Sequence, residues 1–110
     1  MRYLFAVIAN QHGEVRADHD EMTMIDTFND KIEAAGQKIM AVGVAEPDHA
    51  VTFDNRGGRD QKFHGQAIKS ELFMAGFWII EAESDTVAHS LAIEASFACN
   101  RIVEVRPFLN

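Results

Sequence analysis

The chain has 110 residues, of which 47% are apolar and 25% are charged, with seven glycines, two prolines and one cysteine. This composition is typical of a single folded domain and excludes a disordered, collagen-like or disulfide-stabilised chain. Seventeen acidic side chains against ten basic ones leave a formal net charge of −7, which disfavours nucleic acid and anionic membranes as partners. No apolar run is long enough to span a membrane, so we expect a cytoplasmic protein.

The first half of the chain predicts a strand, a helix and several short strands. Residues 3–8 form an apolar run rich in aromatic and β-branched side chains, which predicts a strand buried on both faces. Asp18 stands three residues before Glu21, as in a capping box, and apolar residues then recur at spacings of three and four until Gly36. This pattern predicts an amphipathic helix. Further strands are predicted at residues 39–45, 50–54 and 62–64.

The second half predicts a strand, a helix and a final strand. Residues 76–81 are apolar on both faces and predict a central strand, and Ser84 or Asp85 begins a helix that ends near Asn100. Residues 102–106 alternate and predict the last strand, which Pro107 ends. The order predicts an α+β domain of the ferredoxin-like split βαβ type, an antiparallel sheet with both helices on one face.

Two helices on one side leave the other face of the sheet uncovered. Apolar side chains point to both faces in residues 3–8 and again in residues 77–80. Exposing a large apolar side chain to water forfeits about 1.5–3 kcal/mol, so a second copy of the sheet is the expected cover. The sequence therefore predicts a homodimer formed through the sheet faces.

Residues 64–81 carry a family resemblance. Gly65 is followed by Lys69 and Glu71, and then by Gly-Phe-Trp-Ile-Ile-Glu at residues 76–81. This stretch resembles the YCII-related proteins of the DGPF type, in which Asp-Gly-Pro-Phe-x-Glu-x-Lys-Glu leads into a similar strand. Here only the glycine of the four naming residues remains, and Lys69 and Glu71 invert the family's order. The resemblance extends over nearly the whole chain and implies a dimeric α+β barrel, a fold that includes small isomerases, lyases, cofactor-free monooxygenases and ligand-binding regulatory modules.

The loop that resembles the family signature holds the first candidate site residues. His64 replaces a family acid and is a candidate for proton transfer or ligand binding near neutral pH; the alternative is a solvated loop histidine. Lys69 and Glu71 supply one cation and one anion that would bind a polar molecule, or else form a surface ion pair.

Two strand residues complete the candidate site. Trp78, the only tryptophan, would form the wall of an apolar pocket between the sheets, or else pack in the core or interface. Arg106 would hold an anionic ligand between the sheets, or else form a salt bridge. The spacing of His12, His19, His49 and His89 predicts no metal site, and no phosphate-binding loop or dinucleotide motif is present, so we expect no cofactor.

Two functional hypotheses follow from these observations. The first is a homodimer that binds a small, partly apolar organic molecule between its sheets, with cofactor-free acid/base chemistry of the isomerase or lyase kind if it is an enzyme. The second is a non-catalytic binding or regulatory module that docks a protein partner. Convergence of His64, Lys69, Glu71 and Arg106 on one cavity would favour the first hypothesis.

Overall fold

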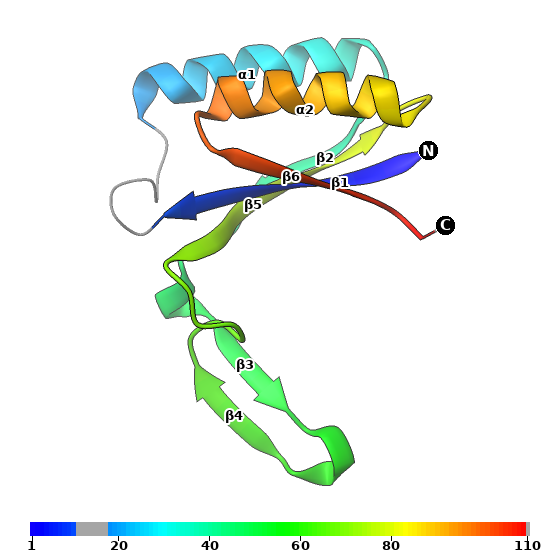
Figure 1. Ribbon diagram of the computed structural model, residues 1–110. Coiled ribbons are helices and arrows are strands. Elements are labelled where there is room, and N and C mark those ends of the chain that lie inside the picture. Colours follow the sequence, from blue (N-terminus) through cyan, green and yellow to red (C-terminus); the bar gives the residue numbers. More distant parts are fainter. Residues whose placement is uncertain (11–17, 110) are drawn as a thin grey trace.

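The structure is a computed structural model that describes residues 1–10 and 18–109. It has a four-stranded antiparallel sheet, two helices that cover one face of it, and a separate two-stranded hairpin (Figure 1). The sheet and its helices are formed by β1 (Arg2–Asn10), α1 (His19–Ala34), β2 (Lys38–Gly43), β5 (Leu72–Glu81), α2 (Asp85–Cys99) and β6 (Ile102–Pro107). The strand order is β2-β5-β1-β6. The predicted α+β architecture with an antiparallel sheet is confirmed. No helix of the described residues is long and apolar enough to cross a membrane.

Both helices begin at the side-chain caps that their sequences predict. The Asp18 carboxylate accepts a hydrogen bond from the backbone N–H of Glu21 at 2.9 Å, and the Ser84 hydroxyl accepts one from Val87 at 3.3 Å. These bonds satisfy N–H groups that the first helical turn leaves unpaired. Helix α2 ends at Asn100, whose φ of 52° is the left-handed conformation that asparagine tolerates better than most residues.

The core lies between the sheet and the helices. Tyr3 pairs with Ile80 and Phe5 with Trp78 across β1 and β5, and all four side chains are buried. Helix α1 adds Phe28, whose ring meets Trp78 edge-on with centroids 5.3 Å apart. Helix α2 packs on the same face through small side chains, chiefly Ala88, Ala92, Ala95 and Ala98. Small side chains let α2 lie close to the sheet and leave the large rings of the strands to fill the core.

Strand β5 begins at Leu72, four residues before the start that the sequence predicts. The strand predicted at residues 76–81 extends further toward the N-terminus, where Met74 pairs with Ile8 of β1. Because Val7 pairs with Gly76, Ala75 is an extra residue on β5, which is a β-bulge. A Cβ atom on Gly76 would lie 2.6 Å from the Val42 carbonyl oxygen, so the neighbouring backbone requires glycine here.

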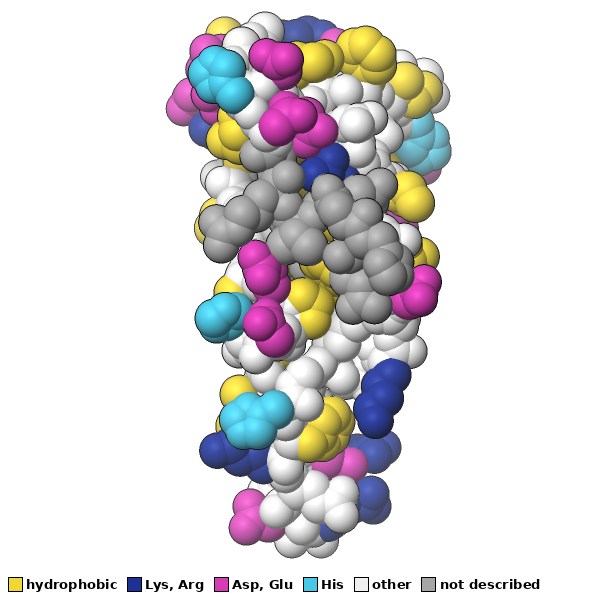
Figure 2. Space-filling model, turned by 90° about the vertical axis from the view of Figure 1, so that its left-hand side faces the viewer, with side chains coloured by type: hydrophobic (Ala, Val, Ile, Leu, Met, Phe, Trp, Pro, Cys, Tyr) yellow, Lys and Arg dark blue, Asp and Glu magenta, His cyan; other side chains and the backbone are white. Residues whose placement is uncertain are grey.

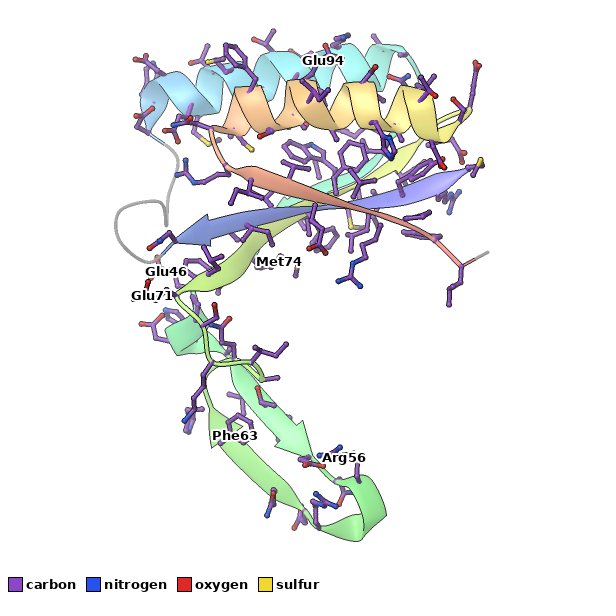
Figure 3. The ribbon with its side chains drawn as sticks, in the orientation of Figure 1. Glu46, Arg56, Phe63, Glu71, Met74 and Glu94 are labelled. Carbon is purple, nitrogen blue, oxygen red and sulfur yellow. The ribbon has the colours of Figure 1, made fainter. Side chains whose placement is uncertain are left out.

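The face of the sheet away from the helices is apolar, and no helix or strand of residues 1–10 and 18–109 covers it. We call it the open face, and it carries Leu4, Ile8, Met40, Val42, Met74, Phe77, Ile79 and Ile102. Met40, Val42, Met74 and Ile102 are exposed. Figure 3 shows Met74 on the underside of the sheet, opposite the helices. The two-sided apolar pattern predicted for the strands is therefore present.

The hairpin consists of β3 (Val51–Asp54) and β4 (Gln61–His64), joined by a 3-10 turn at Arg56–Gly58. We call residues 51–64 the arm. Its strands pair only with each other, and it projects from the side of the sheet opposite the helices (Figure 1). The radius of gyration is 15.6 Å, whereas a compact domain of this length has about 13 Å. The arm makes the subunit more extended than a self-contained domain.

Candidate ligand-binding site

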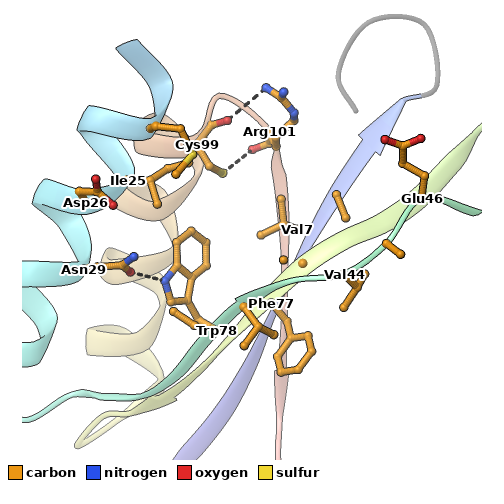
Figure 4. Close-up of a pocket in the computed structure, with 17 residues that line it drawn as sticks. Val7, Ile25, Asp26, Asn29, Val44, Glu46, Phe77, Trp78, Cys99 and Arg101 are labelled. Atoms are coloured by element: carbon orange, nitrogen blue, oxygen red, sulfur yellow. Dashed lines mark hydrogen bonds between the residues drawn. The ribbon is translucent and has the colours of Figure 1, made fainter. Parts of the chain in front are cut away.

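A cavity of about 570 Å³ lies between α1 and the strands β2 and β5 (Figure 4). Its walls are mostly apolar and include Val7, Met22, Ile25, Val44, Phe77 and Trp78. The turn between α2 and β6 contributes Cys99 and Arg101. The cavity lies chiefly on the helix side of the sheet, beneath one end of α1, and is separate from the main depression on the open face.

Small residues on two neighbouring strands create this space. Ala41 of β2 lies opposite Trp78, and Gly43 lies opposite Gly76, so three of these four positions have little or no side chain. Met22, which belongs to the apolar pattern of α1, is exposed where it lines the cavity. Further along α1, Phe28 and Ile32 are buried, because there the helix packs against the aromatic side chains of β1 and β5.

Trp78 forms a rigid wall of the cavity. Its indole Nε1–H donates a hydrogen bond to the Asn29 side-chain oxygen at 2.6 Å, and Phe28 supports the ring at its edge. Only 4% of Trp78 is exposed. Because the hydrogen bond and the packing hold the ring in one orientation, the small accessible part of Trp78 is a fixed apolar element of the cavity wall.

A charged side chain from the turn between α2 and β6, Arg101, lies at one end of the cavity (Figure 4). The Arg101 side chain is 7% exposed, and its Nη1 lies 3.1 Å from the Glu21 carboxylate and 3.2 Å from the Cys99 carbonyl oxygen. Its charge is thus compensated by an acid of α1. The Asp26 carboxylate also lines the cavity and makes no hydrogen bond or ion pair within the described part of the chain.

Cys99 is also at this end of the cavity, with its thiol against the carbonyl oxygens of Ser96 and Arg101. Burial raises the pKa of the Cys99 thiol above its ordinary value of 9.0. The thiol therefore stays protonated at neutral pH and is a poor nucleophile, since the thiolate is the reactive form. The arrangement suits non-covalent binding through an apolar wall and a polar end.

Among the predicted site residues, Trp78 lines the cavity and four others do not. His64 is exposed on β4 and is joined by no hydrogen bond or ion pair to another described residue. Lys69 and Glu71 lie between the arm and β5, and both are exposed. Arg106 lies on the open face, where its Nε is 2.8 Å from Glu104. These four residues do not converge on the cavity.

Sequence reasoning did not select Asn29, Asp26 or Arg101. Asp26 and Asn29 follow Met22 by four and seven residues, so the spacing predicts that all three lie on one face of the helix. Polar residues are common at such positions, so their presence did not indicate a binding site. The clearest missed signal is the repeated small residues Ala41, Gly43 and Gly76. These residues create a cavity only because β2 and β5 pair in this register, which brings together residues more than thirty positions apart in the sequence.

No described group of three histidine, cysteine, aspartate or glutamate side chains is placed to hold a metal ion. His12 lies outside the described residues. The chain matches no known family model, and no curated protein shows significant sequence similarity to it.

Proposed function

We propose that this chain is a small-molecule-binding protein that acts as a homodimer and holds a small, partly apolar organic molecule in the cavity of each subunit. The observation that carries this proposal is the cavity of about 570 Å³, a size common among ligand pockets. The apolar part of the ligand would pack on Trp78. Its hydrogen-bonding end would reach Asp26 or Arg101, so the ligand lies on the helix side of the sheet rather than between two sheets.

The experiment combines a ligand screen with a cavity-filling variant. Small carboxylates, phenols and lactones are tested for an increase in melting temperature, and Trp78, as the only tryptophan, reports binding directly by fluorescence. Ala41→Leu places a larger side chain opposite Trp78 and should abolish the response. Ala34→Leu, at the exposed end of α1, should preserve it. No response to any compound, or an equal response in Ala41→Leu, would contradict the proposal.

Acid/base chemistry on the bound molecule would have to use a group in the cavity. Asp26 offers a carboxylate there, whereas His64 lies on the arm. We therefore expect His64→Ala to leave ligand binding unchanged and Asp26→Asn to weaken it. Loss of binding in His64→Ala would show that the arm histidine reaches the ligand, in line with the role first predicted for it.

The homodimer is supported by the open face and its charges. The order β2-β5-β1-β6 with two helices on one side fits a ferredoxin-like sheet, and the open apolar face is the surface that a dimeric α+β barrel would bury. Glu104 and Arg106 lie together on this face, so the surface offers both charges to a symmetric copy of itself. We also propose that the chain is related to the YCII-related proteins that it resembles in sequence.

The dimer is tested by placing a charge on the open face. Met74→Arg would bury an unpaired guanidinium between the sheets, and sedimentation should show a monomer near 12.3 kDa. Ile93→Arg, on the exposed outer face of α2, should leave the wild-type mass unchanged. A wild-type protein that sediments as a monomer at micromolar concentration would contradict the dimer. A monomer that associates only with another protein would instead favour the docking-module hypothesis.

A further inference from the structure

The arm lacks the support that a two-stranded hairpin needs. Such hairpins are marginally stable in water unless they pack against a third strand or a helix. The arm is tied at its base by two bonds, from the Gly65 N–H to the Ala50 carbonyl and from the Thr52 hydroxyl to the Gly65 carbonyl, each 2.8 Å. Beyond its base it projects away from the sheet (Figure 1).

One face of the arm carries two exposed apolar side chains, Val51 and Phe53. The pairing of Val51 with His64 and of Phe53 with Lys62 places these four side chains on the same face. Phe53 is 68% exposed, and Lys62 covers it only in part, with its Nζ 5.9 Å from the ring centre. An exposed aromatic ring beside an aliphatic side chain, on a hairpin without a core, is typical of an interaction surface.

The arm also differs in charge from the rest of the molecule. Residues 51–64 carry three basic and two acidic side chains, whereas the rest of the chain carries seven basic and fifteen acidic ones. In Figure 2 several basic side chains lie over the arm together with acidic ones, whereas acidic side chains predominate over the rest of the visible face. Asp54 pairs with Arg56 at 2.8 Å and with Arg59 at 3.5 Å, so Lys62 is the arm's one cation that makes no ion pair with another described residue.

We propose that the arm of each subunit packs against a second copy of this chain through the face that carries Val51 and Phe53. The arm projects from the same side of the sheet as the open face, so two subunits that meet there each extend an arm across the other. The open face of a second copy carries Leu4, Ile8 and Met74, so it offers apolar side chains to Val51 and Phe53 of the arm. This contact rests on the homodimer proposed above and adds a second buried surface to it.

Two equally simple substitutions test the arm in the full-length protein. Phe53→Ser removes the exposed ring of the arm, and Phe97→Ser removes a ring that is 77% exposed on the outer face of α2. Sedimentation equilibrium should show the dimer dissociation constant raised about tenfold by Phe53→Ser and changed less than twofold by Phe97→Ser. Equal dissociation constants for both variants, in a protein that does dimerise, would overturn the arm contact and leave the dimer intact.

Hydrogen exchange of the unaltered protein gives a second readout that needs no mutation of the arm. Amides of residues 51–64 should exchange more slowly as the protein concentration rises through the dimer dissociation constant. In Met74→Arg they should exchange rapidly at every concentration. Arm exchange that is independent of concentration in a dimeric protein would overturn the contact, while a wild-type monomer would overturn the arm contact and the proposed dimer together.

Discussion

The two faces of the sheet are both apolar, but only one of them is covered by the helices. On the helix side, Tyr3, Phe5, Trp78 and Ile80 are buried in a continuous core. On the open face, the alternate residues of the same strands are also apolar, but no element in the described part of the chain covers them. Sequence composition does not distinguish the faces; the positions of α1 and α2 do. The covered face supplies subunit stability, and we expect the open face to supply association.

Neighbouring isoleucines on β5 allow the two faces to be compared with the same substitution. Ile80 is fully buried on the helix side, so Ile80→Ala should lower the free energy of unfolding by about 2–5 kcal/mol. Ile79 is half-buried on the open face. Ile79→Ala should therefore lower the free energy of unfolding less than Ile80→Ala in a monomer, and by a similar amount when the dimer is populated. Urea unfolding at several protein concentrations measures both. A cost for Ile79→Ala that does not change with concentration would contradict coverage of the open face.

The paired glycines of β2 and β5 give the next largest effect. Gly76→Ala places a Cβ 2.6 Å from the Val42 carbonyl oxygen, and relieving this overlap should cost about 1–3 kcal/mol because backbone must move. Gly43→Ala is the matched control, since its Cβ would meet the nearest atom at 3.8 Å. Chemical denaturation compares them. Equal losses of stability in Gly76→Ala and Gly43→Ala would contradict the prediction, because they would show that the close approach of the Val42 carbonyl oxygen does not require glycine at position 76.

A hydrogen bond beneath α2 should make the covered face sensitive to high pH. The Tyr3 hydroxyl donates to Asp85 at 2.7 Å, and this bond, together with burial, raises the pKa of Tyr3 from 10.0 to about 12. The stabilisation is complete below pH 10 and is lost as the pH rises through 12, because the folded state resists deprotonation. Unfolding curves of wild type and Tyr3→Phe should therefore converge between pH 10 and 12; parallel curves would contradict the assignment.

The smallest effect is expected where the two helices meet at the surface. Lys31 of α1 and Glu94 of α2 form an ion pair, and both side chains are exposed, with Glu94 on the outer side of the helix layer (Figure 3). Glu94→Gln should change the free energy of unfolding by about 0–1 kcal/mol, because water screens the pair. Thermal unfolding in low and high salt measures this difference. A larger loss would mean that the pair fixes how α1 and α2 pack.

Much of the fold was predictable from local sequence. The caps at Asp18 and Ser84, the two helices and the two-sided strand at residues 3–8 all follow from residue type and spacing. Helix caps and helical or alternating periodicity involve residues that are close in the sequence, so these features can be predicted from the sequence alone. Of the candidate site, Trp78 was predicted as a pocket wall, although the cavity lies on the helix side of its strand.

The sequence by itself determined the elements, the apolar character of both sheet faces and the excess of acid over base. Only the tertiary structure decided where the bulge at Ala75 falls, that Ala41 and Gly76 leave a cavity beside Trp78, and that the arm leaves the sheet on the side opposite the helices. Each of these features depends on register and packing between segments distant in the chain, and such pairing cannot be read from the spacing of residues within one segment.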